Sequence, residues 1–291
     1  MSEDTDVGSE GGDTPVGNAS DVTDQSLFDA LETIRESEPL VQQLTNEVTK
    51  NDLAQVTLHW GGLPVMSDAP EESTEMAQLA SGMLINTGRM TETNVEALHN
   101  AGETATELGL PVVLDPVGAG ATPTRLEVAE SLLSSVEFAA IKGNYGEISA
   151  LAGSEAEVRG VESVGDYDEI HETARALADA TDTVVVASGV EDIVADADNA
   201  YRISGGHEMM GEVVGTGCML GASLATFAAA IENPLSACLH GTVAFGIAGE
   251  SAADLPHNGP ASYRINFLDT VFDIRNVPAS EFGVDGRVNQ I

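Results

Sequence analysis

The chain has 291 residues, of which 48 are acidic and 11 basic, so its formal net charge is −37. A surface this acidic repels nucleic acids and anionic membranes, and neither is expected as a partner. Hydrophobic residues still make up 42% of the chain, which excludes a fully disordered protein and permits one large domain or two small ones. An ordinary core under an acidic, lysine-poor surface resembles proteins of salt-loving organisms, in which salt screens the repulsion.

Cysteine usage and the N-terminal composition favour the cytoplasm. The two cysteines, Cys218 and Cys238, are too few for a disulfide framework and form no CxxC metal motif. The N-terminal residues are acidic and polar, whereas a secretion signal has a basic region and an apolar core. The apolar run 219–231 is too short and too rich in alanine for a membrane span. We therefore expect a cytoplasmic protein without a transmembrane helix.

The first part of the chain predicts a tail followed by helices. Residues 1–22 are almost free of apolar side chains, which predicts a disordered acidic tail. Helical spacing of apolar residues predicts an amphipathic helix over 26–37, ended by Pro39, and a second helix ended by Gly61 and Gly62. The segment 39–46 between them is expected to be extended.

From residue 63 onward, strands and helices alternate. Strands are expected over 63–66, 82–86, 111–116, 138–142 and 183–189. Helices are expected near residue 71 and over 91–108, 124–133, from 144 onward, and over 168–179. A β-hairpin over 192–204, three helices over 217–231, 234–251 and 260–275, and a polar tail over 277–291 complete the chain.

This alternation predicts the fold class. Apolar strands separated by helices of ten or more residues are typical of an α/β protein with a mainly parallel sheet and helices on both faces. We expect a single domain over residues 23–276. Ligands of such sheets bind at the carboxyl ends of the strands, so the polar residues just past each strand are candidates for a site. These residues are Met66, Ser67, Asn86, Asp115, Lys142, Asn144, Ser188 and Gly189.

The segment Gly215-Thr216-Gly217-Cys218 starts a long apolar helix. The first amides of a helix lack intrahelical partners and carry the positive end of the dipole, so such a start binds anions, and glycines let a phosphate approach closely. The same field predicts a pKa of the Cys218 thiol lowered from about 8.5 towards neutral, which would make it a potential base. The alternative is a plain helix start with a buried cysteine acting as a small hydrophobe.

Two further strand ends favour a magnesium–nucleotide site. Asp115 precedes a glycine-rich turn, and Asn144 and Glu147 lie one helical turn apart, so carboxylate and amide oxygens suited to Mg²⁺ meet at one edge. Lys142, one of two lysines in the chain, could contact a phosphate as a point charge. The alternatives are a simple turn at Asp115 and a helix capping box formed by Asn144 and Glu147.

Together these segments resemble the ribokinase-like superfamily and, within it, the hydroxyethylthiazole kinase family. The resemblance runs from about residue 30 to residue 275. It includes Leu44-Thr45-Asn46, Pro64-Val65-Met66, the run from Leu114 to Pro123, Asn144-x-x-Glu147 and Gly215-Thr216-Gly217-Cys218. Most relatives in the superfamily have Asp where Cys218 stands, whereas Cys is typical of the thiazole kinases.

The resemblance implies transfer of the ATP γ-phosphoryl group to the hydroxyl of 4-methyl-5-(2-hydroxyethyl)thiazole, a step of thiamine salvage. It implies that Met66, Gly215 and Asn46 contact the thiazole, that Lys142, Ser188 and Asn144 contact ATP, and that Asp115 and Glu147 organise Mg²⁺. The amides of Gly215, Thr216 and Gly217 would stabilise the developing charge, and Cys218 would accept the hydroxyl proton. It also implies a homotrimer with active sites at subunit interfaces.

Two other functions are compatible with these residues. One is a different small-alcohol kinase of the same fold, such as a hydroxymethylpyrimidine kinase. The other is a nucleotide-binding module without catalytic activity.

Overall fold

The structure, a computed structural model, describes residues 22–159 and 169–291. The described part of the chain forms one nine-stranded sheet in the order β2-β1-β3-β4-β5-β6-β7-β8-β9. All neighbours from β2 to β6 are parallel, and β7, β8 and β9 are antiparallel to their neighbours. The strands are β1 Leu40–Leu44, β2 Leu63–Val65, β3 Gly82–Asn86, β4 Val112–Asp115, β5 Ala140–Asn144, β6 Val184–Ser188, β7 Asp192–Ala195, β8 Ala200–Ile203 and β9 Val288–Gln290.

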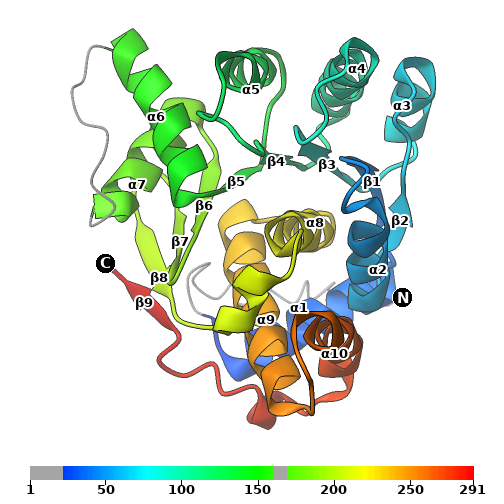
Figure 1. Cartoon of the computed structure of the whole chain (residues 1–291), viewed down its shortest axis with the longest axis vertical. Coiled ribbons are helices and arrows are strands. Elements are labelled where there is room, and N and C mark those ends of the chain that lie inside the picture. The colour runs from blue at the N-terminus through cyan, green and yellow to red at the C-terminus, as the bar shows by residue number, and fades with distance from the viewer. Residues whose placement is uncertain (1–21, 160–168) are drawn as a thin grey trace, which may run out of the picture.

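Helices cover both faces of this curved sheet (Figure 1). The outer face carries α3 Pro70–Ala77, α4 Glu92–Leu108, α5 Pro123–Ser135, α6 Tyr145–Arg159 and α7 Ile170–Thr181. The inner face carries α1 Asp24–Ser37, α2 Lys50–Trp60, α8 Thr216–Ala228, α9 Pro234–Asp254 and α10 Pro260–Asp273. The predicted α/β class, with a mainly parallel sheet between two helical layers, is confirmed. None of the helices in the described ranges is long and apolar enough to cross a membrane.

The continuous apolar strands explain the two layers. In β3, Leu84 belongs to the core cluster on the side of α8 and α9, whereas Met83 and Ile85 belong to the cluster on the side of α4 and α5. All three side chains are fully buried. Because alternate residues of a strand point to opposite faces, a strand covered by helices on both sides must be apolar at every position. This is why strands β3, β4, β5 and β6 are recognisable from sequence.

Strand β1 was predicted only as an extended segment, because Gln42 and Gln43 interrupt its apolar pattern. Both side chains are fully buried. The Nε2 group of Gln42 donates to the Ser73 carbonyl at 2.9 Å, and that of Gln43 donates to Thr57 Oγ1 at 2.7 Å. Each of these hydrogen bonds offsets part of the cost of burying its amide, while Oε1 of both side chains has no hydrogen-bond partner among the described residues. The strand lies second from the edge of the sheet.

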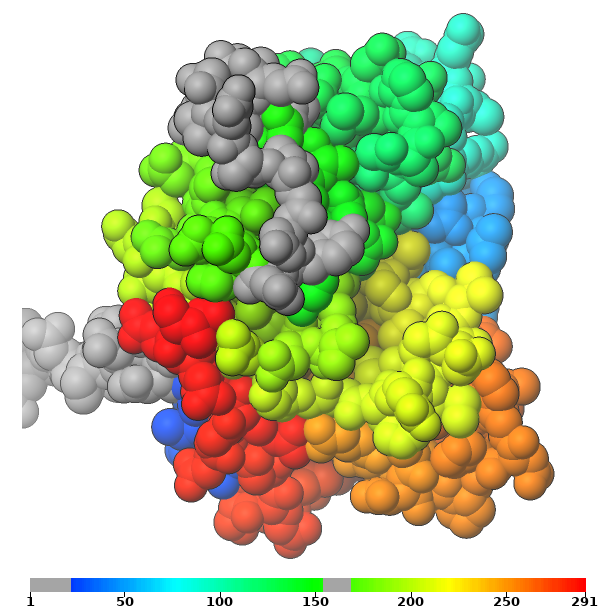
Figure 2. All heavy atoms as spheres, turned by 60° about the vertical axis from the view of Figure 1, so that its left-hand side comes forward, coloured from blue at the N-terminus to red at the C-terminus, as the bar shows by residue number. Residues whose placement is uncertain are grey.

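The C-terminal segment differs from the prediction of a polar tail over 277–291. Its residues 288–290 form β9, which pairs antiparallel with β8, and Figure 2 shows this red segment along the yellow-green hairpin. Only Val288 of the strand is partly buried, so a three-residue edge strand leaves no apolar period in the sequence. The predicted tail over 1–22 lies outside the described residues except for Val22. Of the helix predicted over 168–179, the described part starts at residue 169.

The net charge of −37 predicts that stability depends on salt. We expect the thermal midpoint, followed by circular dichroism, to fall by at least about 10 °C when KCl is lowered from about 3 M to 0.1 M, because carboxylate repulsion is then unscreened. Sucrose, which strengthens apolar burial without screening charge, should not replace the salt. Equal midpoints at both KCl concentrations would contradict this prediction.

Candidate active site

The carboxyl ends of the parallel strands meet the start of α8. Gly215, which precedes this helix, has a φ of +91°, and a Cβ there would lie 2.5 Å from Cγ2 of Thr49. Both the backbone conformation and the close approach therefore require glycine. The Thr216 amide donates to the Val213 carbonyl at 3.4 Å. Since α8 packs against β3 and β4, the remaining amides of its first turn and its positive end face the ends of the central strands.

A buried ion pair lies under this helix start. Asp115, the last residue of β4, is 1% exposed, and Lys142 in β5 is 4% exposed. Lys142 Nζ lies 3.5 Å from Oδ1 of Asp115, and a Cβ on Gly217 would lie 3.0 Å from the same Nζ. The lysine thus joins the strand-end carboxylate to the first turn of α8, a place suited to a phosphate.

Burial and the charge of the partner both shift the pKa values of Asp115 and Lys142. Burial alone favours the neutral amine, but the carboxylates of Asp115 and Glu147 outweigh it, so the pKa of Lys142 lies above its ordinary value. Burial also raises the pKa of Asp115, although the facing Lys142 opposes this shift. A buried carboxylate with a raised pKa is a better proton acceptor than an exposed one.

Two amides connect Asp115 to the cysteine. The Nδ2 group of Asn86 donates to Oδ2 of Asp115 at 2.5 Å and lies 3.3 Å from Sγ of Cys218. The Nδ2 group of Asn46 lies 3.2 Å from Oδ1 of Asn86 and 3.9 Å from the same sulfur. Asn86 is fully buried at the end of β3. The sequence marked it only as one polar residue among several at strand ends, and no motif distinguished it.

Glu147 forms the capping box that sequence analysis offered as an alternative. Its Oε2 accepts from the Asn144 amide at 2.8 Å, and its own amide donates to Oδ1 of Asn144 at 2.9 Å. Its Oε1 accepts from the Gly118 amide at 2.7 Å, which fastens the glycine-rich turn after β4 to the start of α6. Each carboxylate oxygen has a second lone pair, so this structural role does not exclude a contact with a cation.

The donor set fits a hard divalent cation that is shared with phosphates. Oδ1 of Asp115 is buried and, apart from its ion pair with Lys142, has no hydrogen-bond partner among the described residues. Within the same residues, no group of three or more histidine, cysteine, aspartate or glutamate side chains could hold a metal alone. Mg²⁺ commonly takes one or two carboxylates and completes its shell with water and substrate phosphates. Asp115 and Glu147 match that pattern.

A cavity of about 490 Å³ lies beside the start of α8. This volume is in the range of small-molecule sites. Asp192 lies in its wall, and sequence analysis did not select this residue. Burial raises the pKa of Asp192 to about 6, and its Oδ1 accepts from the Gly189 amide at 3.0 Å. The lining residues are Ser188, Gly189, Val190, Asp192, Gly205, Gly206, His207, Glu208, Met210, Gly211, Thr216, Gly217, Leu220, Phe245 and Gly246.

The predicted site residues therefore occupy one edge of the sheet. Contacts bring together Asn46, Asp115, Lys142 and Cys218 through Asn86. Met66 is half-buried just after β2, on the side of Asn46, whereas Ser188 ends β6 on the opposite side and lines the cavity. The start of α8 lies between these two sides.

Comparison with known proteins supplies the family. Residues 31–276 match the hydroxyethylthiazole kinase family. The hydroxyethylthiazole kinase of Natronomonas pharaonis is 54% identical over 265 residues, which cover 90% of this chain and 95% of that protein. The chain belongs to the hydroxyethylthiazole kinase family. The hydroxyethylthiazole kinase of Haloquadratum walsbyi is 49% identical and covers 90% of this chain and 92% of its own length.

Solved structures of related proteins have the same fold as this member of the hydroxyethylthiazole kinase family. The structure of a hydroxyethylthiazole kinase protein from Pyrococcus horikoshii OT3 has a TM-score of 0.81 at 35% identity, covering 92% of this chain and 99% of that one. A pyridoxal kinase from Staphylococcus aureus has a TM-score of 0.57 at 12% identity, and the match covers 73% of this chain and 87% of that one. At this identity the likeness shows a common fold alone. The ribokinase-like fold is therefore confirmed.

In this hydroxyethylthiazole kinase family member, the predicted lowering of the Cys218 pKa is wrong. Burial, together with the negative charge of Asp115, raises the pKa of the Cys218 thiol to about 11, and these effects outweigh Lys142 and Asn86. The sequence shows the helix start but not the carboxylate beside the sulfur. The thiol is therefore protonated at neutral pH. Cys238 is fully buried in the core.

Proposed function

We propose that the protein transfers the γ-phosphoryl group of ATP to the hydroxyl of 4-methyl-5-(2-hydroxyethyl)thiazole, as its family membership suggests. The observation that carries this proposal is the buried pair of Asp115 and Lys142 at the start of α8, with Cys218 linked to the same carboxylate through Asn86. A phosphate and an alcohol would meet at this point, the phosphate on the side of the 490 Å³ cavity and the alcohol on the side of Asn46 and Met66.

Charge stabilisation supplies most of the catalysis in this proposal. Phosphoryl transfer passes through a loose transition state, so the protein's contribution is positioning and neutralisation of oxygen charges. The amides of Thr216 and Gly217, together with the Gly215 turn, would hold the phosphate oxygens, and Lys142 would add a full positive charge beside them. Ser188 and Asn144, at the ends of β6 and β5, would contact the nucleotide.

The two carboxylate oxygens of Asp115 would have different roles in this reaction. Oδ1, on the side of Lys142, and the oxygens of Glu147 would hold Mg²⁺, which neutralises phosphate charge when it is bound. Oδ2, on the side of Asn86 and Cys218, would accept the hydroxyl proton late in the reaction. The protonated thiol of Cys218 would then orient the hydroxyl rather than remove its proton.

We also propose that the protein is a homotrimer and lies in the cytoplasm. Val48 and Val214, which flank the loops of Asn46 and Gly215, are 76% and 74% exposed. Large apolar side chains beside a substrate site favour burial against another subunit, and a homotrimer with active sites at its interfaces fits them. The free thiols of Cys218 and Cys238 fit a reducing cytoplasm.

A kinase assay in high KCl tests the proposed function. ADP formation should depend on hydroxyethylthiazole and Mg²⁺, and hydroxymethylpyrimidine and pyridoxal should be poor acceptors in the same panel. Light scattering on the same preparation should give three times the chain mass. Preference for another alcohol would reassign the substrate, and nucleotide binding without phosphorylation of any alcohol would refute the kinase proposal.

The Cys218→Ala variant tests the role of the thiol. Because the pKa of about 11 keeps the sulfur protonated, we expect kcat to fall by about tenfold or less, with the KM for ATP within about twofold. Steady-state kinetics from pH 6 to 8 should show no thiol ionisation in the wild type. A fall of about 10³-fold in the variant, with ATP binding intact, would make Cys218 the base.

A further inference from the structure

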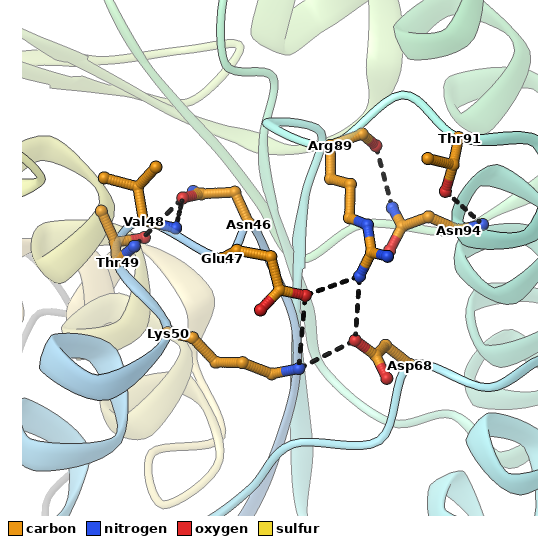
Figure 3. Close-up of polar contacts among 9 residues, drawn as sticks. All are labelled: Asn46, Glu47, Val48, Thr49, Lys50, Asp68, Arg89, Thr91 and Asn94. Atoms are coloured by element: carbon orange, nitrogen blue, oxygen red, sulfur yellow. Dashed lines mark hydrogen bonds and ion pairs between the residues drawn. The ribbon is translucent and has the colours of Figure 1, made fainter.

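Four charged side chains form a cluster on the outer side of the Asn46 loop, and we call Glu47, Lys50, Asp68 and Arg89 the four-charge cluster (Figure 3). Arg89 Nη1 lies 2.6 Å from Oε1 of Glu47 and 3.4 Å from Oδ2 of Asp68. Lys50 Nζ lies 2.8 Å from the same oxygen of Asp68 and 4.0 Å from Oε1 of Glu47. Each cation thus contacts both carboxylates.

The cluster joins three separate connections at the carboxyl edge of the sheet. Glu47 and Lys50 belong to the β1–α2 connection and the first residue of α2, Asp68 to the β2–α3 connection, and Arg89 to the β3–α4 connection. Figure 3 shows the Arg89 and Lys50 side chains pointing from different segments towards Asp68 and Glu47. The four charges cancel, which disfavours the cluster as a binding site for a free anion or cation.

Neighbouring hydrogen bonds fix the backbone that carries the cluster. Nδ2 of Asn94 in α4 donates to the Arg89 carbonyl at 2.9 Å. Oδ1 of Asn46 accepts from the amides of Val48 and Thr49 at 3.0 and 3.1 Å, which shapes the turn before α2. The Lys50 hydrogen bond is the largest effect on Asp68 and lowers the pKa of that carboxyl, so it stays charged at neutral pH.

Each connection also carries a residue of the proposed alcohol site. Asn46 directly precedes Glu47, Met66 lies two residues before Asp68, and Asn86 lies three residues before Arg89. Asn46 and Asn86 contact each other and the cysteine on the inner side, and a Cβ on Gly88 would lie 2.9 Å from both residues. The four-charge cluster therefore connects, on their outer side, the same loops that carry Asn46, Met66 and Asn86 and whose inner side faces Cys218.

We propose that Arg89 and Lys50 are positioning residues for the alcohol substrate, which hold the Asn46, Met66 and Asn86 loops together through the four-charge cluster. This proposal rests on the proposed function for the identity of the alcohol. Ser188 and the 490 Å³ cavity lie on the other side of α8, so we expect ATP binding not to depend on the cluster.

Kinetics of Arg89→Gln test this proposal. We expect the KM for hydroxyethylthiazole to rise about three- to tenfold, since partly exposed ion pairs are individually weak, while the KM for ATP stays within about twofold. Arg89→Lys should recover part of the affinity. Arg35→Gln is the matched control, because it removes the same charge from an exposed i,i+3 pair with Glu32 on α1, and it should leave both constants unchanged.

A second measurement keeps the two proposals separate. Calorimetric binding of hydroxyethylthiazole without ATP should weaken in Arg89→Gln by the same factor as the KM rises. An unchanged KM for the alcohol in an active variant, an equal rise in the KM for ATP, or dissociation of the oligomer would overturn the positioning role alone. A wild type that binds hydroxyethylthiazole but phosphorylates no alcohol would refute the proposed function, and the binding comparison would still decide the role of the cluster.

Discussion

Asp115→Asn is expected to lower kcat by about 10³-fold or more, with the KM for ATP changed far less. Asparagine keeps the shape of the side chain but removes the negative charge. It loses the proton acceptor on the side of Asn86 and Cys218 and the carboxylate oxygen that faces Lys142. Single-turnover measurements of phosphoryl transfer, made in high KCl with saturating ATP and alcohol, provide the test.

A matched substitution separates chemistry from folding. Asp196→Asn makes the same change in the β7–β8 hairpin, where Oδ1 of Asp196 accepts from the amides of Asp198 and Asn199. An asparagine oxygen can accept the same bonds, so this variant should keep full activity. Thermal midpoints of both variants show whether either fold is affected. If Asp115→Asn retains more than about a tenth of the wild-type kcat, the carboxylate is not the proton acceptor.

The sequence predicts those parts of this site that depend on local pattern. Strand ends such as Asp115 and Lys142 follow continuous apolar runs, and the start of α8 is marked by Gly215 and Gly217, so their common edge could be inferred. The link between Asp115 and Cys218 through Asn86 could not be inferred, because Asn86 reaches both residues only through the pairing of β3 with β4 and the packing of α8. Long-range contacts of this kind have no sequence period.

The prediction of side-chain pKa values from sequence failed where these values depend on long-range contacts. A cysteine at a helix start is ordinarily expected to have a lowered pKa, but burial and the charge of Asp115 reverse the shift at Cys218. Asp192 escaped notice for a similar reason, because burial raises the pKa of this carboxyl and the local sequence does not show that burial. Strand β1 was predicted only as an extended segment because Gln42 and Gln43 interrupt its apolar pattern, and the edge strand β9 was missed because it has no apolar period.

Lys142→Gln is expected to lower kcat/KM for ATP by about 10²- to 10³-fold, the range for losing one charged contact to a transferring group. The substitution leaves Asp115 and Glu147 without the cation that both carboxylates stabilise, so the free energy of unfolding should also fall. Kinetics and urea unfolding in high KCl measure the two effects separately.

Lys142→Arg is the informative companion to this variant. It keeps the positive charge beneath Gly217, so it should recover most of the lost kcat/KM. If Lys142→Gln loses stability but binds ATP as tightly as the wild type, the lysine serves only the buried carboxylates. If Lys142→Arg restores both stability and kcat/KM, the positive charge itself serves the fold and the phosphate site. The same cation then balances Asp115 and Glu147 in the free protein and the phosphate oxygens during the reaction.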